Sequence, residues 1–436
     1  MYKPDFFKPI LLSLSFVLIF TKGNCQAQNL ANDKIFLDAL LWKNWNAASS
    51  VLSGFLKGQL PPGGVEKVFT NAVQQLGKFQ RYDTTAVLLS KRSASFVCSF
   101  EKETLLMQIA SNDSAMIVGF FFRPLEKAYQ PPAYADRSGF KQKNMFIQTD
   151  SMHLPAVLTM PAKTGKWPVL IFIGGSGPND KDETLGAEKP FRDLAMGLGV
   201  NGIASLRFDK RSLAYPGNFK SKNYTLTDEY LEDIKNAITD ISHIDGIDTN
   251  RIYLLGHSMG GMIAPLILKE NKIFKGAVML EANARPLQEL VLEQMKYLSL
   301  KDTSKETSSG NIEQIKKQVA AINNITIKDS SKEYLGAKGS YWLSLKKYDQ
   351  VMVASRLKSQ KLLIIQGGED YQVNNTDFQL WKKQLNGKTN VQFNFLEKID
   401  HALVEGNGSM SPSEYSIPKN VPKYLVDLIA DWINEK

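Results

Sequence analysis

The sequence predicts an α/β protein in which helices cover both faces of an open, mostly parallel sheet, preceded by a small α+β domain. Two patterns carry this prediction. From residue 146 onward, short apolar runs alternate with helical patterns, as in parallel strands joined by helices. Before residue 126, two helical patterns are followed by runs of period two, which favour an antiparallel sheet.

The length and composition fit a globular protein of two domains. The chain has 436 residues, of which 43% are hydrophobic and 22% are charged, as in ordinary globular proteins. The formal net charge is +9, but basic and acidic residues are interspersed, which favours a solvated surface over nucleic-acid binding. No pattern predicts an oligomeric state.

The first 27 residues have the pattern of a secretory signal peptide. Two lysines precede an apolar core at residues 10–20, and residues 25–27 offer a small-x-small cleavage site. We expect cleavage after Ala27 and export to the periplasm or the extracellular space, without stable membrane insertion afterwards. A lipoprotein anchor at Cys25 is an alternative, but residues 21–24 match such a site poorly. An uncleaved anchor is another, although the apolar core is short for a membrane span.

Residues 28–125 are expected to form the small α+β domain. Helices are predicted at residues 36–47 and 65–76, and strands at residues 86–89, 95–100, 105–109 and 115–122. This order of elements resembles the nuclear-transport-factor-2-like domains that precede some secreted bacterial hydrolases. Cys98 lies in an alternating run, so we expect a half-buried strand residue. Residues 126–145, which contain Pro, Gly and many charges, are predicted to be a linker.

The second domain, residues 146–436, is expected to contain the sheet. Its strands are predicted at residues 146–149, 156–160, 169–173, 203–208, 252–255, 277–280, 362–365 and 391–396. The first two form an antiparallel pair, and helices are expected at residues 190–198, 227–241 and 421–432. Ligands of such sheets bind at the carboxyl ends of the strands, so the chemistry is sought there.

A strand–turn–helix pattern makes Ser258 the candidate nucleophile. The apolar run 251–255 leads into G-H-S-M-G at residues 256–260, and a helical pattern follows. G-x-S-x-G between a strand and a helix is typical of the nucleophile elbow of serine hydrolases. A serine hydroxyl is a weak nucleophile at neutral pH, so the chain must also supply a base and an acid.

His401 is the candidate base. The chain has four histidines, and this one follows the predicted strand 391–396 at its carboxyl end. The others are placed less well, because His153 precedes the nucleophile, His243 lies on the wrong side of its strand, and His257 is inside the elbow.

Asp370 is the favoured acid. It follows the predicted strand 362–365 after two glycines, between serine and histidine in chain order. Glu281, at the end of the preceding strand, is the alternative acid. Asp400 is too close to His401 to orient its ring, so we expect it to shape the loop.

Two backbone amides are expected to form an oxyanion hole. One belongs to Met259, where a helix begins. The other comes from the glycine loop 174–178, from Gly175 or Ser176. The loop lacks the Lys-Ser/Thr of a phosphate-binding P-loop, and the chain has no Cys/His cluster of the kind that binds zinc. We therefore predict neither a cofactor nor a metal.

Several segments together resemble the α/β-hydrolase superfamily, in particular the bacterial carboxylesterases related to dienelactone hydrolases, over about residues 146–436. They are GGSGPNDKDET at 174–184, PFRDLA at 190–195, RFDKR at 207–211, GHSMG at 256–260 and GGEDYQV at 367–373. The resemblance implies an α/β-hydrolase fold and a Ser258, Asp370, His401 triad that cleaves esters through an acyl-enzyme. Relatives commonly carry histidine where this chain has Gly174. Asp209 and Arg211 are expected to be a salt-bridged scaffold rather than catalytic groups.

A helical cap is predicted at about residues 287–357. About 80 residues separate Glu281 from Lys361, too many for an ordinary crossover, and helical periodicity runs through them. Four large cap residues either line an acyl pocket or pack the cap onto the body: Met295, Tyr297, Tyr341 and Trp342.

The sequence thus predicts an exported serine hydrolase that cleaves carboxylic esters of small molecules or glycans. A peptidase, amidase or thioesterase on the same fold is one alternative. A binding protein with a vestigial hydrolase site is the other, and an intact triad argues against it.

Overall fold

The computed structural model describes residues 25–435 apart from residues 85–86, 91, 125–128, 218–222 and 302–307. The chain divides into two compact units, residues 1–126 and 127–436. Of the predicted signal peptide, residues 1–24 lie outside the described residues. Among the described residues, no helix is both long and apolar enough to span a membrane.

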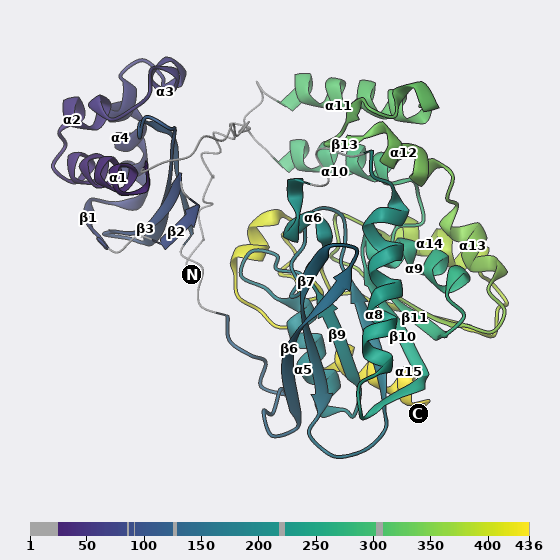
Figure 1. Cartoon of the computed structure of the whole chain (residues 1–436). Coiled ribbons are helices and arrows are strands. Elements are labelled where there is room, and N and C mark those ends of the chain that lie inside the picture. The colour runs from purple at the N-terminus through teal and green to yellow at the C-terminus, as the bar shows by residue number, and fades with distance from the viewer. Residues whose placement is uncertain are drawn as a thin grey trace. The chain divides into compact units, whose positions relative to one another are not determined.

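The first unit combines four helices with an antiparallel sheet (Figure 1). The helices are α1 (Cys25–Leu41), α2 (Trp45–Ser50), α3 (Gly54–Gln59) and α4 (Gly64–Leu76). The strands are β1 (Phe79–Tyr82), β2 (Val87–Ser90), β3 (Ser93–Phe100), β4 (Thr104–Ser111) and β5 (Ile117–Pro124). The sheet order is β1-β3-β4-β5, and β2 also pairs with β3. The predicted antiparallel sheet is confirmed, whereas the likeness to nuclear-transport-factor-2-like domains stays a prediction.

The first unit differs from expectation at two places. The helix predicted at residues 36–47 is interrupted, because Lys43 has a φ of 54° and Asn44 caps a new helix by accepting the Ala47 amide. Cys98, expected to be half-buried, is fully buried in the core with Phe36 and Phe96. Burial raises the pKa of the Cys98 thiol to about 12, so it stays protonated at neutral pH.

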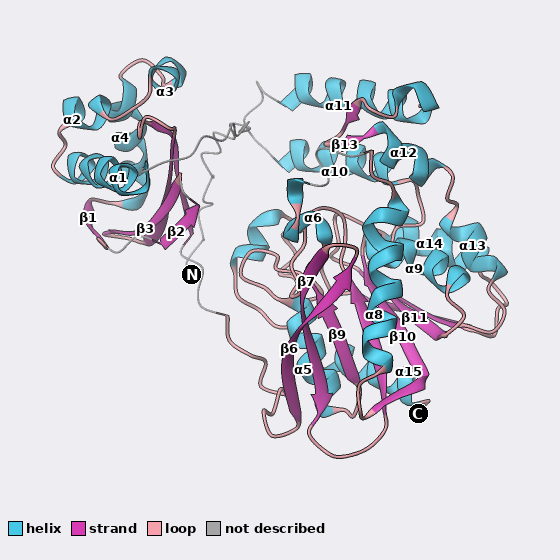
Figure 2. Cartoon of the chain, in the orientation of Figure 1, coloured by secondary structure: helices cyan, strands magenta, loops and turns pink. Residues whose placement is uncertain are grey.

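The second unit contains an eight-stranded sheet in the order β15-β14-β11-β10-β8-β9-β7-β6. Figure 2 draws its strands in magenta and labels β6, β7, β9, β10 and β11. Its strands are β6 (Phe140–Thr149), β7 (Met152–Pro161), β8 (Trp167–Ile173), β9 (Ala204–Phe208), β10 (Ile247–His257), β11 (Phe274–Leu280), β14 (Lys361–Gly367) and β15 (Val391–Leu396). Within this sheet, every pair of neighbouring strands between β15 and β9 is parallel, and β7 is antiparallel to both β9 and β6. This confirms the predicted fold class. Residues 140–145, expected to end the linker, belong to β6.

Helices cover both faces of this sheet. Successive side chains of β8 point to opposite faces, and both sets are buried, so each face must be covered. Leu170 and Phe172 pack with α5 (Pro190–Val200) and α15 (Lys423–Asn434). Val169, Ile171 and Ile173 point to the other face and pack with α8 (Glu232–Ser242), α9 (Met259–Glu270), α13 (Gln350–Arg356) and α14 (Asn375–Gln384). Shorter elements connect them, namely α6 (Arg211–Ala214), the π-helix η1 (Thr227–Leu231) and the 3-10 helix η3 (Pro412–Ser416).

The insertion between β11 and α13 is largely helical and lies at one end of the sheet (Figure 1). It contains α10 (Leu287–Lys301), α11 (Ser308–Asn323), η2 (Ile327–Asp329), β12 (Glu333–Tyr334), β13 (Ala337–Lys338) and α12 (Gly339–Lys346). A small core of its own, around Ile322, Ile325 and Trp342, holds it together. Ala354 of α13 joins the core of the body, although α13 lies within the predicted cap range.

Candidate active site

Ser258 occupies the sharp turn between β10 and α9. Its φ of 53° and ψ of −120° lie in a region that serine seldom adopts, and such conformations are concentrated at functional sites. The flanking glycines are sterically required. A Cβ on Gly256 would lie 2.3 Å from the Gly260 carbonyl oxygen, and one on Gly260 would lie 2.2 Å from the Ile173 oxygen. The turn therefore has the geometry of a nucleophile elbow.

His401 and Asp370 form a buried hydrogen-bonded pair. His401 Nδ1 lies 2.7 Å from Asp370 Oδ2. The other oxygen of Asp370 accepts the amides of Gln372 and Val373, at 2.7 and 2.9 Å, which fixes the carboxylate. His401 and Ser258 line the same cavity of about 110 Å³. The structure thus brings all three predicted residues to one place.

Glu281, the alternative acid, is buried beside Asp370 and shares a hydrogen bond with it, but its other partners differ. Its carboxyl oxygens lie 2.8 and 2.9 Å from the Gly367 amide, and the Gln366 side chain also donates to it. Burial, together with the negative charge of Asp370, raises the pKa of Glu281 well above its ordinary value. Of the two candidate acids, Asp370 is the one that binds the histidine ring.

The backbone amides predicted to bind an oxyanion differ in whether they already donate a hydrogen bond within the protein. The Gly175 amide donates to Glu183 Oε1 at 2.7 Å, so it is already occupied. The Ser176 and Met259 amides donate to no other described residue. Ser176 lines the cavity, and Met259 begins α9 directly after Ser258. Of the predicted donors, the Ser176 and Met259 amides are therefore the two without an acceptor among the described residues.

Glu183 and His257 form a supporting network that the sequence did not reveal. His257 Nδ1 lies 3.0 Å from Glu183 Oε1, and its Nε2 lies 2.8 Å from the carbonyl oxygen of His401. Burial lowers the pKa of His257, but the charge and hydrogen bond of Glu183 outweigh it and the net shift is upward. Through these two contacts the His257 ring links Glu183 to the His401 loop.

Two charged residues near the site have structural roles, as predicted. Asp209 pairs with Lys181 at 3.1 Å, and Arg211 pairs with Asp233. Asp400 accepts the amides of two residues in its own loop and so shapes it.

None of the four large cap residues lines the cavity, and Tyr297, Tyr341 and Trp342 pack against other side chains instead. The lining from the cap comes instead from α10, through Leu287, Leu290, Val291 and Gln294. Tyr297 stacks on Tyr371 with 5.4 Å between ring centroids, and Tyr341 donates to Glu229. Among the described residues, no cluster of His, Cys, Asp and Glu could hold a metal ion.

The sheet order, the flanking helices and the turn at Ser258 define the class of protein, an α/β-hydrolase. A family described as "Serine aminopeptidase, S33" matches residues 189–406, and the chain belongs to this family. Esterase EstD from Thermotoga maritima is 30% identical over 404 residues, which cover 92% of this chain and 94% of that protein.

Solved structures of hydrolases are more distant in sequence. The 2,6-dihydroxy-pseudo-oxynicotine hydrolase is 15% identical, with a TM-score of 0.43 and coverage of 69% of this chain and 68% of that one. The acylaminoacyl peptidase of Pyrococcus horikoshii is also 15% identical, with a TM-score of 0.48 and coverage of 82% and 56%.

Proposed function

We propose that the protein is an exported serine esterase that works through Ser258, His401 and Asp370. The observation that carries this proposal is the 2.7 Å contact between Asp370 and His401 at a cavity that Ser258 also lines. The similarity to Esterase EstD supports ester cleavage. Export rests on the signal-peptide pattern of residues 1–27.

The reaction follows from the roles of these groups. The Ser258 oxygen attacks the ester carbonyl carbon while its proton passes to Nε2 of His401, and Asp370 stabilises the imidazolium that forms. The oxyanion accepts hydrogen bonds from the Ser176 and Met259 amides. Collapse of this intermediate expels the alcohol, which takes the proton from His401. Water then repeats the sequence on the acyl-enzyme and releases the acid.

The cavity favours small acyl groups over the amino terminus of a peptide. Its volume is about 110 Å³, and its walls include Leu290, Val291 and Val373. Among the described residues that line it, Glu183 is the one carboxylate. Its side chain is only 2% exposed and its Oε1 is bound to the Gly175 amide and to His257, so it is poorly placed to bind a substrate ammonium group. We therefore favour short-chain esters, of small molecules or glycans, as substrates.

A substrate panel with the Ser258→Ala variant tests the proposal. The wild type is expected to hydrolyse p-nitrophenyl acetate faster than an acetyl thioester or an aminoacyl-naphthylamide. Loss of the nucleophile should lower kcat by a factor on the order of 10⁶, without changing the melting temperature. Ser114→Ala, an exposed serine of the first unit, is the matched control and should keep full activity.

Two outcomes would contradict this function. Faster cleavage of the naphthylamide than of the ester would identify a peptidase or amidase. Absence of all hydrolysis by a folded wild-type protein would identify the site as vestigial.

A further inference from the structure

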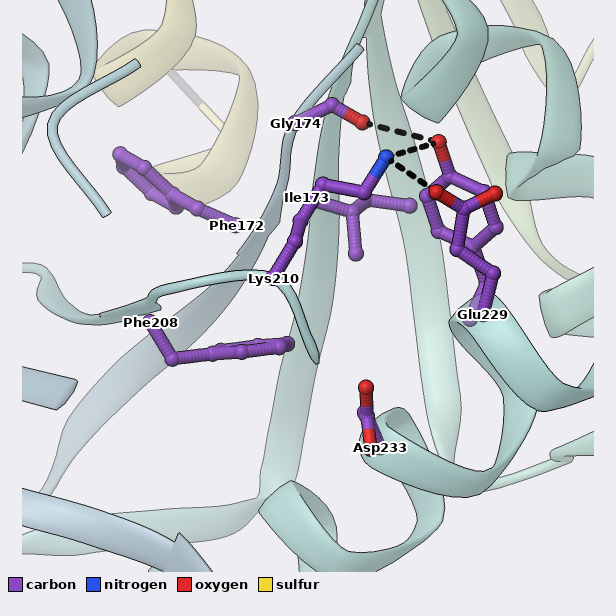
Figure 3. Close-up of a pocket in the computed structure, with 8 residues that line it drawn as sticks. Phe172, Ile173, Gly174, Phe208, Lys210, Glu229 and Asp233 are labelled. Atoms are coloured by element: carbon purple, nitrogen blue, oxygen red, sulfur yellow. Dashed lines mark hydrogen bonds and ion pairs between the residues drawn. The ribbon is translucent and has the colours of Figure 1, made fainter. Parts of the chain in front are cut away.

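A buried lysine lies directly behind the glycine loop. Lys210 Nζ has three partners, the Gly175 carbonyl oxygen at 2.7 Å, the Tyr230 hydroxyl at 2.9 Å and Glu229 Oε1 at 2.8 Å. Figure 3 shows the Lys210 ammonium facing Glu229, with a dashed line between them. The Lys210 and Glu229 side chains are only 5% and 6% exposed. All three N–H bonds of the ammonium are therefore used inside the protein.

The cavity beside this lysine has almost no space for water and is lined by apolar side chains as well as by Glu229 and Asp233. Phe172, Ile173 and Phe208 line a cavity of about 10 Å³ beside it (Figure 3). Such a volume holds at most about one water molecule. In a medium of low dielectric constant, a charged hydrogen bond to a carbonyl is stronger than in water.

The π-helix η1 presents two consecutive side chains, Glu229 and Tyr230, to the same ammonium. Turns of this type are rare and frequently mark functional sites. Tyr230 also donates to the Gly175 oxygen at 3.0 Å, so that oxygen receives two hydrogen bonds from the buried side. Tyr341 of α12 donates to the second oxygen of Glu229, which ties the cap to this cluster.

The geometry of the peptide bond links the contact at the Gly175 carbonyl to the orientation of the Ser176 N–H. The carbonyl of Gly175 and the N–H of Ser176 belong to one peptide group, and in a trans peptide they point in opposite directions. A carbonyl that is held toward Lys210 therefore directs the Ser176 N–H away from it. Ser176 lines the cavity with Ser258, and its amide donates to no other described residue.

We propose that Lys210 is a positioning residue for the oxyanion hole. Its ammonium fixes the orientation of the peptide between Gly175 and Ser176 and polarises it, which increases the partial positive charge on the Ser176 N–H. Glu229 and Tyr230 hold the ammonium in place. The inference rests on the proposed serine esterase function and adds to it a residue that contacts neither substrate nor nucleophile.

The first test is the Lys210→Met variant, which keeps the length of the side chain but removes the ammonium. With p-nitrophenyl acetate, kcat is expected to fall by about 10- to 100-fold, less than for complete loss of an oxyanion donor. KM should change by less than about twofold, since the lysine acts only when charge develops on the substrate. The inhibition constant of a trifluoromethyl ketone, which forms an oxyanion on the serine, should rise by the same factor as kcat falls.

The single variant leaves the Glu229 carboxylate buried without its cationic partner, and a buried charge without a counter-charge destabilises a protein. The double variant Lys210→Met/Glu229→Gln removes both charges, and we expect its melting temperature to recover while kcat stays low. If activity returns together with stability, Lys210 acts on stability alone and the inference is overturned. Tyr230→Phe keeps both charges and should lower kcat by about three- to tenfold.

The matched control is a second buried ion pair on the same segment. Arg211→Met/Asp233→Asn removes a pair whose side chains are 6% and 2% exposed and which has no hydrogen bond to the glycine loop. Its kcat should equal that of the wild type, and a loss as large as that of the Lys210 variants would overturn the inference.

The two proposals fail in different ways. A folded wild type without esterase activity contradicts the proposed function and the inference with it. An active wild type, an inactive Ser258→Ala variant and a fully active Lys210→Met variant contradict the inference alone.

Discussion

Asp370 and Glu281 are neighbouring buried carboxyl groups with different partners. Asp370 binds the His401 ring and two backbone amides, whereas Glu281 binds the Gly367 amide. Burial, with the negative charge of Asp370, raises the pKa of Glu281 well above its ordinary value, which favours the neutral form of this carboxyl group. A neutral carboxyl group gives little stabilisation to an imidazolium, which leaves this role to Asp370.

Two amide substitutions separate the roles of these carboxyl groups. Asp370→Asn should lower kcat for p-nitrophenyl acetate by a factor on the order of 10⁴, because the amide favours the wrong histidine tautomer. Glu281→Gln keeps an oxygen that accepts the Gly367 amide, and the His401 ring binds Asp370 instead, so its kcat should fall by less than about tenfold. Both measurements are made at pH 7, with the melting temperature as a check on folding. The reverse order of effects would assign the acid to Glu281.

The helix α10 forms one wall of the cavity because its apolar residues recur at helical spacing. Leu287, Leu290, Val291 and Gln294 are at positions i, i+3, i+4 and i+7, so they share one face of the helix. Leu300 on the same helix is 87% exposed and does not line the cavity. The size of the acyl group that the enzyme accepts should therefore depend on the face of α10 that lines the cavity, and not on Leu300.

Shortening Leu290 is expected to enlarge the acyl site. In Leu290→Ala, the ratio of kcat/KM for p-nitrophenyl butyrate to that for the acetate should rise by at least about tenfold, because a single methylene in an apolar pocket already changes kcat/KM by about that factor. Leu300→Ala is the control on the same helix, and its ratio should not change. An unchanged ratio in Leu290→Ala would show that this wall does not contact the acyl group.

Elements with a strong local signal could be predicted from the sequence, and those set by tertiary contacts could not. The elbow was predictable because a buried apolar strand, G-x-S-x-G and a helical pattern follow one another at residues 251–270. The helix expected at residues 227–241 begins instead with the π-turn η1. This turn could not be predicted, because one extra residue in a turn hardly alters the apolar periodicity of the sequence. Glu183 and His257 are 74 residues apart, so no local pattern could pair them.

The whole molecule consists of two units, each with its own hydrophobic core, and all the candidate catalytic residues lie in the second. The similarity to Esterase EstD covers 92% of this chain, so it includes residues of the first unit as well. The sequence could predict the fold and the three candidate catalytic residues because each follows a strand of one sheet. It could not predict that the Gly175 amide is occupied, because that depends on how the loop folds back onto Glu183.

The most direct test of the central claim is to identify the residue that a fluorophosphonate probe modifies. Intact-protein and peptide mass spectrometry of the labelled full chain should find one adduct, on the peptide that contains Ser258. Hydrolysis of p-nitrophenyl acetate should disappear in proportion to labelling, and Ser258→Ala should not react. An adduct on another residue, or full hydrolysis after complete labelling of Ser258, would contradict the assignment of Ser258 as the nucleophile.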